Sequence, residues 1–263
     1  MMPRDRPPRS ALNKCPLSGE KGSEMIRCTG GDLIARELTL EALLVPLNAV
    51  ERKHAPRTLY VSGDLEILSR GGRVAIVGAR KASADGLKRA ARLARLVSER
   101  GAVVVSGLAE GIDTAAHEAA IHHGGKTIAV IGTPLEQVYP AKNRALQEAI
   151  AHSHLLLSQF PPGHPVTKAN FPQRNRTLAL VCDVSVIIEG GKSSGTLSLG
   201  WEALRLGRPL FVTSSVVEDG GLSWPREMLR YGARILSDQV LDEFLGQIPP
   251  RSRVRFSDTP TRP

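Results

Sequence analysis

The chain has 263 residues, of which 41% are hydrophobic and 4% aromatic, and its formal net charge is +9. That length can bury a substantial core, either as one large α/β domain or as two small ones. No apolar run reaches the roughly 18 residues of a membrane span, and no apolar segment follows the basic first residues, so neither a membrane protein nor a secretory signal is indicated. A cytoplasmic location is the default expectation.

The positive charge is spread along the chain. Residues 1–36 carry 7 Lys/Arg against 4 Asp/Glu, residues 246–263 carry 4 against 1, and residues 37–245 hold 24 against 21. Total basicity is therefore weak evidence for nucleic-acid binding, and local clusters must decide. The three cysteines have no C-x-x-C spacing, which argues against a disulfide framework and a structural zinc site. Cys182 lies in an apolar run and is expected to be a small buried side chain.

The composition predicts three segments. Residues 1–36 are expected to be a flexible or disordered N-terminal segment, in which Met25 is an alternative start to Met1. Residues 37–246 are expected to form the folded domain, and residues 247–263 a flexible basic C-terminal tail.

Within the folded segment, helical spacing over 38–50 follows a possible cap at Thr39, and residues 57–68 resemble a short edge strand and a turn. Seven apolar runs of strand length follow, "RVAIVGAR", "AVVVSG", "KTIAVIGT", "HLLLSQF", "DVSVIIEGG", "RPLFVTSS" and "ARILS". Helices are predicted at 84–100, 112–123, 141–152, 170–181, 195–207 and 224–231. This alternation predicts an α/β fold with a doubly wound, mostly parallel sheet and helices on both faces.

In such a sheet, ligands bind beyond the carboxyl ends of the strands. The segments to consider there are 78–83, 106–113, 132–144, 158–176, 189–196 and 213–221. Three of them are glycine-rich and precede helices, a combination that suits anions, although glycine is also common in ordinary turns. None is a strict G-x-G-x-x-G or Walker A loop, so the pattern does not indicate ATP hydrolysis.

Cations gather in the same segments. They are Arg80, Lys81, Lys142, Arg144, Arg174, Arg176 and Lys192. If they converge, they form a groove for several phosphates, which suits a polymer better than one nucleotide. Phe171 and Tyr139 lie beside them and either stack on bases or belong to the core. Lys88, Arg89, Arg92, Arg95 and Arg100 are expected to form the solvated face of a helix.

Signs of catalysis are weak. Asp113 and His117 lie four residues apart, which predicts at most a local hydrogen bond on a helix. The chain contains no H-E-x-x-H and no other dense cluster of metal ligands, so we predict no catalytic residues, no metal and no cofactor. Residues 106–111 are instead expected to form a turn that binds an anion. The backbone N–H groups of Gly107 and Gly111 in this turn, and of Gly195 in the segment 189–196, are expected to hold phosphate. Asp113 is expected to organise that turn by facing backbone N–H groups.

Several segments together resemble the DNA-processing protein A family, also called Smf, over about residues 56–236. The matching pieces are "LYVSGDLEIL", "VAIVGARKAS", "SGLAEGIDTAAHEAA", "GGKTIAVIGTPLEQVYPAKNRAL", "NFPQRNRTLA" and "SSGTL". The resemblance implies an extended Rossmann-like fold that forms a homodimer, binds single-stranded DNA at the strand ends without catalysis, protects incoming DNA and helps to load the recombinase RecA in natural transformation or recombination.

By position, the resemblance implies DNA- or phosphate-binding roles for a set of residues: Arg80, Ser106, Gly107, Gly111, Lys142, Asn143, Asn170, Arg174, Asn175, Arg176, Ser194, Gly195 and Thr196. The glycine-rich loops and their cations add Gly78, Lys81 and Lys192 to the predicted site. Residues 213–228 depart from the family pattern, which bears on one edge of the pocket and on the usual dimer contacts. The helical domain that many members carry before this region and the winged-helix-like domain after it are both expected to be missing.

The main alternative is an enzyme related to the cytokinin-activating phosphoribohydrolases, because "EGGKSSGTLSLGWE" is similar to their P-G-G-x-G-T-x-x-E motif. Glu202 lies six residues after Thr196 where that motif has three, which turns it to another helix face. A sensor of a free nucleotide is a third possibility.

Overall fold

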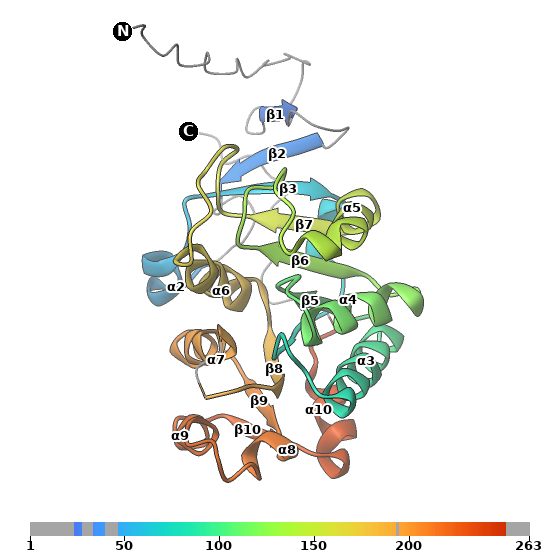
Figure 1. Ribbon diagram of the computed structural model, residues 1–263, viewed down its shortest axis with the longest axis vertical. Coiled ribbons are helices and arrows are strands. Elements are labelled where there is room, and N and C mark those ends of the chain that lie inside the picture. Colours follow the sequence, from blue (N-terminus) through green and yellow to red (C-terminus); the bar gives the residue numbers. More distant parts are fainter. Residues whose placement is uncertain (1–23, 28–33, 40–46, 193–194, 251–263) are drawn as a thin grey trace, which may run out of the picture.

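The fold is organised around one ten-stranded sheet with helices on both faces (Figure 1). The structure is a computed structural model and describes residues 24–27, 34–39, 47–192 and 195–250. The strands lie in the order β1-β2-β3-β7-β6-β5-β4-β8-β9-β10. The predicted α/β class with a mostly parallel, doubly wound sheet is therefore confirmed.

Seven parallel strands form the main part of the sheet, and each corresponds to one of the predicted apolar runs. They are β4 (Arg73–Gly78), β5 (Val103–Ser106), β6 (Thr127–Ile131), β7 (Leu155–Ser158), β8 (Val184–Glu189), β9 (Leu210–Thr213) and β10 (Arg234–Leu236). From β4 the chain adds β5, β6 and β7 on one side and then β8, β9 and β10 on the other. The order of the sheet thus reverses between β4 and β8, which is where ligands bind in open sheets of this kind.

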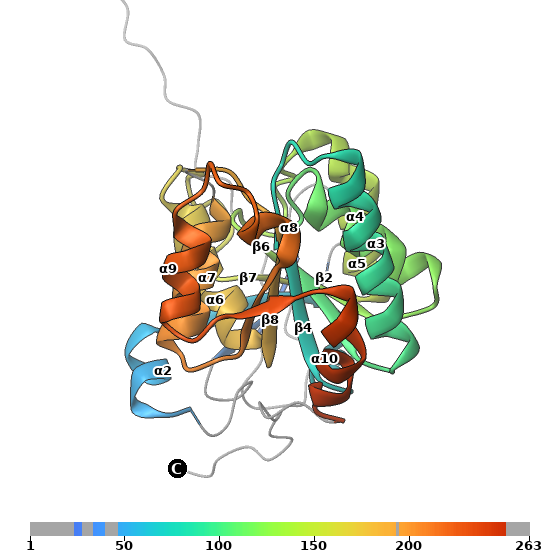
Figure 2. The same ribbon diagram turned by 90° about the horizontal axis from the view of Figure 1, so that it is seen from below.

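The helices cover both faces of this sheet. On one face lie α3 (Ala84–Glu99), α4 (Ile112–His122), α5 (Arg144–Ser153) and α10 (Leu241–Gln247), and on the other lie α2 (Ala49–His54), α6 (Asn170–Val181), α7 (Gly195–Arg205) and α9 (Trp224–Arg230) (Figures 1 and 2). A short helix, α8 (Ser214–Val217), follows β9. All six helices that the sequence predicts after residue 84 are present, with ends that differ by at most three residues.

The strands contain unbroken apolar runs because both of their faces are covered. In β5, Val104 packs into one core cluster, whereas Val103 and Val105 pack into the cluster on the opposite face. All four residues of β5 are buried. Continuous hydrophobicity is the pattern expected of a parallel strand between two helical layers.

The N-terminal part differs from the sequence-based expectation. The predicted edge strand β3 (Thr58–Gly63) is internal, because it pairs antiparallel with both β7 and β2 (Ile34–Thr39). β2 pairs in turn with β1 (Glu24–Arg27). The predicted flexible segment 1–36 therefore contains β1 and the start of β2, and the proposed boundary at 37 falls inside a strand.

The helix predicted over 38–50 is also wrong in its first residues. Leu38 and Thr39 belong to β2, and the helix α2 begins only at Ala49, after an Asn48 cap that forms a reciprocal capping box with Glu51. Sheet pairing outweighs the local helical spacing here. Residues 40–46 lie outside the described residues, as do 1–23 and 251–263.

Candidate functional site

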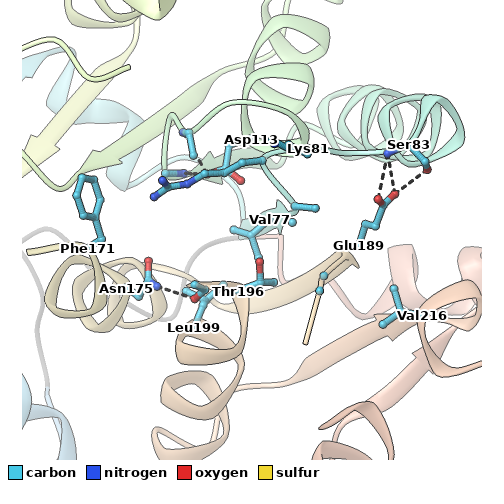
Figure 3. Close-up of a pocket in the computed structure, with 18 of the residues that line it drawn as sticks. Val77, Lys81, Ser83, Asp113, Phe171, Asn175, Glu189, Thr196, Leu199 and Val216 are labelled. Atoms are coloured by element: carbon cyan, nitrogen blue, oxygen red, sulfur yellow. Dashed lines mark hydrogen bonds between the residues drawn. The ribbon is translucent and has the colours of Figure 1, made fainter. Parts of the chain in front are cut away.

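A cleft of about 790 Å³ opens where the sheet order reverses, at the carboxyl ends of β4 and β8 (Figure 3). The loops after β4, β5, β8 and β9 line it together with parts of α6 and α7. The predicted site residues that line the cleft are Gly78, Arg80, Lys81, Gly107, Asp113, Arg174, Asn175, Gly195 and Thr196. Tertiary structure thus brings together residues separated by more than a hundred positions in the sequence.

The turn after β5 is held by Asp113. Its Oδ2 accepts hydrogen bonds from the backbone N–H groups of Gly107 at 3.1 Å and Ala109 at 3.4 Å. The prediction that this carboxylate faces backbone N–H groups is confirmed. Burial raises the pKa of Asp113, and the charge of Arg174 and these hydrogen bonds oppose that rise. The Gly107 N–H is consequently occupied by Asp113, which corrects the expectation that it holds a phosphate.

Glycine at position 111 is required by the close approach of two loops. Gly111 has φ +79°, and a Cβ on it would overlap the backbone carbonyl oxygens of Ala79 and Arg80. Its neighbour Ile112 donates its N–H to the Ala79 carbonyl at 3.3 Å. Gly111 does not itself line the cleft. It fixes the loop that carries Arg80 against the start of α4.

Arg174 forms part of the buried framework. Only 6% of its surface is exposed, and its Nη1 donates to the carbonyl oxygens of Gly107 and Val130. Its Nε donates to Asn175 Oδ1 at 3.1 Å. Burial lowers the pKa of Arg174 to about 10, although Asp113 acts in the opposite direction. The guanidinium therefore joins the ends of β5 and β6 to α6, which corrects the expectation of a free loop cation.

The predicted serine and asparagines are likewise buried and bonded internally. Asn143 donates to the carbonyl of Leu108 at 2.9 Å, and Leu108 has the uncommon φ of 57°. Ser106 Oγ donates to the Ile76 carbonyl at 2.7 Å. Asn170 bonds to Thr167 and Pro165, and Asn175 to Gly195. Buried polar groups with full sets of partners specify loop shape more directly than they bind ligands.

The exposed side of the cleft carries different chemistry. Arg80 and Lys81 are exposed, and neither has a carboxylate partner among the described residues. The Arg80 guanidinium lies 5.5 Å from the ring centroid of Phe171, and the Tyr139 ring lies 5.3 Å from that ring. Tyr139 is 47% exposed, so it does not belong to the core. This rim offers cations and aromatic faces to a ligand.

Other predicted cations do not converge on the cleft. Lys142 pairs with Glu110 at 2.8 Å, Arg144 with Glu148 at 3.9 Å, and Arg176 with Glu202 at 3.0 Å. These residues do not line the cleft, and neither does the exposed Lys192. Ser194 lies outside the described residues. Of the predicted cations, only Arg80, Lys81 and the buried Arg174 line the cleft. Lys142, Arg144 and Arg176 pair with carboxylates outside it, and Lys192 does not line it.

The comparisons with known proteins agree with this architecture. Residues 38–246 match the family model described as DNA recombination-mediator protein A. The chain is 39% identical over 201 residues to the DNA processing protein DprA of Streptococcus pneumoniae, covering 76% of this chain and 71% of that protein. It is 32% identical over 205 residues to its Bacillus subtilis counterpart, covering 77% and 67%. The chain belongs to the DNA recombination-mediator protein A family.

Two solved structures of this family share the fold. The Streptococcus pneumoniae DNA processing protein A matches with a TM-score of 0.69 and 34% identity, covering 81% of this chain and 74% of that one. The Helicobacter pylori protein matches with a TM-score of 0.67 and 30% identity, covering 78% and 93%. The Helicobacter pylori structure is described for its single-stranded DNA binding mode.

The predicted Asp113–His117 hydrogen bond does not form. His117 is fully buried and its Nδ1 lies 2.6 Å from Thr127 Oγ1, whereas Asp113 faces the turn. Burial lowers the pKa of His117 to about 3, which keeps it neutral.

The described residues contain no group of three or more His, Cys, Asp or Glu placed to hold a metal. None of the described helices is both long and apolar enough to cross a membrane. Cys182 is buried, as predicted.

The enzyme alternative is not favoured by the geometry of α7. Glu202, the carboxylate compared with the phosphoribohydrolase motif, accepts hydrogen bonds from Arg176 and Arg205 at 3.0 Å. It is buried and does not line the cleft. A catalytic carboxylate would have to face the ligand space.

Three groups of cleft residues were not among the predicted site residues, although most of them lie in the segments 78–83, 189–196 and 213–221 that the sequence singles out. Arg89 lines the cleft although helical spacing placed it on a solvated face. Ser83 and Glu189 both line the cleft and are hydrogen-bonded to each other. Ser215, Val216, Asp219 and Leu222 come from the segment 213–228 that departs from the family pattern. The segment 213–228 follows a predicted strand directly, and this position was the signal that it could line the ligand site. For Arg89, the helical spacing gives no sign that it differs from its exposed neighbours on the same helix.

Proposed function

We propose that this family member binds single-stranded DNA in the cleft at the carboxyl ends of β4 and β8. The observation that carries the proposal is the exposed rim of the cleft: Arg80 lies over the Phe171 ring, Lys81 lines the same cleft, and neither cation has a carboxylate partner among the described residues. Cations neutralise backbone phosphates and aromatic faces stack on bases without sequence preference. The Helicobacter pylori relative, which covers most of the same fold, supports this assignment.

We infer that the protein acts on DNA without catalysis, in the cytoplasm and as a homodimer. Single-stranded DNA held in this way is protected and can be passed to a RecA-type recombinase during transformation or recombination. The description of the matching family as a recombination mediator supports that role. Light scattering measures the dimer, and a RecA strand-exchange assay with DNA coated by a single-strand binding protein measures the loading.

The binding proposal is tested with a fluorescent oligo-dT at two or more salt concentrations. We expect the affinity to fall steeply as salt is raised. The logarithm of the binding constant should fall with the logarithm of the salt concentration with a slope of about 0.7 for each phosphate neutralised on a single strand. In parallel, release of free base from a nucleoside monophosphate is measured. Absence of oligo-dT binding, or binding that does not respond to salt, would contradict the proposal. Base release would instead establish the hydrolase.

A further inference from the structure

The N-terminus of α3 is occupied by a carboxylate of the chain itself. Glu189, the last residue of β8, accepts a hydrogen bond from the Ser83 N–H at 3.0 Å and one from the Ser83 hydroxyl at 2.7 Å (Figure 3). Ser83 is the N-cap of α3 and accepts the Gly86 N–H at 2.9 Å. The side chain of Glu189, at the end of β8, therefore accepts hydrogen bonds at the start of α3, the helix that follows the neighbouring strand β4.

This position is where a phosphate binds in sheets of this type. β4 and α3 form the first strand–helix unit of the parallel sheet, and in doubly wound folds the turn of that unit places phosphate oxygens at the helix N-terminus. A carboxylate uses the same N–H and O–H donors as a phosphate. Glu189 therefore stands where a mono- or dinucleotide would place its phosphates.

Two details show that the loops are shaped around this carboxylate. A Cβ on Gly86 would overlap Glu189 Oε2, so glycine at that helix position leaves the room that the carboxylate fills. Arg89, one turn further along α3, lies 4.0 Å from the same oxygen. The charge of Arg89 is partly offset, and the cations left for a ligand are those of the β4 loop, Arg80 and Lys81.

We propose that Glu189 is a specificity-determining residue of this cleft. Its negative charge keeps phosphate away from the N-terminus of α3 and from Arg89. It thereby disfavours compact ligands with a pyrophosphate group and leaves binding to a chain whose phosphates lie along Arg80 and Lys81. The preference for a DNA chain rests on the proposed function, whereas the exclusion of phosphate from the N-terminus of α3 does not.

The test compares wild type with Glu189→Gln, which keeps one oxygen to accept the Ser83 N–H, replaces the other oxygen by an NH2 group and removes the charge. The matched control is Asp85→Asn. Asp85 lies in the same first turn of α3 and pairs with Lys88 at 3.5 Å, but its side chain is 76% exposed and does not line the cleft. Both variants lose one negative charge near the start of α3, but only Glu189 lines the cleft.

For oligo-dT we expect Glu189→Gln to bind roughly three- to tenfold more tightly at low salt, since a like charge near phosphate is removed. We expect its salt slope to steepen by about 0.7, because one further phosphate is neutralised. Asp85→Asn should match wild type. A Glu189 that only caps the helix would change the midpoint of thermal unfolding and leave the salt slope unaltered, which would overturn the inference.

A second measurement separates this inference from the proposed function. Inorganic pyrophosphate is titrated into wild type and both variants by calorimetry, and we expect measurable binding only with Glu189→Gln. If wild type binds no oligo-dT but Glu189→Gln gains pyrophosphate binding, the DNA proposal fails and the anion position is established. If Glu189→Gln gains neither ligand while its thermal unfolding matches wild type, Glu189 does not control access. Should that variant unfold, Glu189→Ser, which also removes the charge, is measured in its place and must gain pyrophosphate binding for the inference to stand.

Discussion

The floor and the rim of the cleft differ in how they use polar residues. On the floor, Asp113 and Arg174 are buried and bonded to backbone groups of neighbouring turns, and Asn143 behind the cleft is held in the same way. On the rim, Arg80 and Lys81 are exposed and have no carboxylate partner among the described residues. Both groups belong to motifs that resemble those of the family. The difference shows that a motif for binding contains residues that shape the site as well as residues that contact the ligand.

The largest expected effect comes from the floor. Arg174→Ala leaves the carbonyl groups of Gly107 and Val130 and the carboxylate of Asp113 buried without the guanidinium. We expect a loss of about 3 to 5 kcal/mol in unfolding free energy, as for other buried charges that lose a partner. Urea denaturation measures it. The exposed Arg80→Ala should stay within about 0.5 kcal/mol of wild type, and equal effects of the two would remove the distinction between floor and rim.

Backbone strain at Gly111 should rank next. Gly111→Ala places a Cβ against two carbonyl oxygens at a φ of +79°, so we expect a loss of about 2 to 3 kcal/mol. Gly101→Ala is the matched control, because Gly101 also has a positive φ, +69°, but nothing lies within 4 Å of its Cβ position. That control should lose only about 1 to 2 kcal/mol. Similar losses at both sites would show that the loop contact is unimportant.

The buried His117 makes the stability of the fold depend on pH. Its pKa is lowered to about 3 from 6.5, so between these values the unfolded chain binds a proton that the folded protein excludes. Stability is therefore complete above about pH 6.5 and falls as the pH drops toward 3, by up to about 1.4 kcal/mol per pH unit. His117→Asn, which can donate to Thr127 in the same place, should flatten this slope in thermal unfolding from pH 7 to 4. His122→Asn, on an exposed residue of α4, should leave the slope as in wild type.

The smallest effect on stability and the clearest effect on binding belong to the rim. Arg80→Ala should weaken oligo-dT binding several-fold and reduce the salt slope by about 0.7, because one phosphate contact is lost. Arg176→Ala provides the comparison, since Arg176 is paired with Glu202 and lies outside the cleft. We expect its affinity to be close to wild type. An Arg176 effect as large as that of Arg80 would place the DNA along α6 instead.

Much of the fold could be predicted because its signals are local. Each parallel strand is a short apolar run and the following helices have their own spacing, with a local cap at α3, where Ser83 accepts the Gly86 N–H. The prediction failed at residues 38–39, where pairing with β3 decides between helix and strand. Pairing partners lie far apart in the sequence, so local periodicity does not reveal them.

The site was predicted less completely than the fold. The sequence predicted cations in the loop after β4, and Arg80 and Lys81 of that loop line the cleft. The pairing of Lys142 with Glu110 and the burial of Arg174 depend on loops that meet only in the folded chain. Residue type alone does not distinguish a cation that awaits a ligand from one that already has a partner.

The sequence by itself determined the order of strands and helices, the glycine-rich turns at the strand ends and the family to which the chain belongs, because these reside in short contiguous patterns. Tertiary structure decided which charges are free. It placed Glu189 at the start of α3, Arg174 beneath the turn after β5 and Arg80 on the rim. The physical reason is that the availability of a charge depends on its burial and on its nearest partner, and strand order sets both.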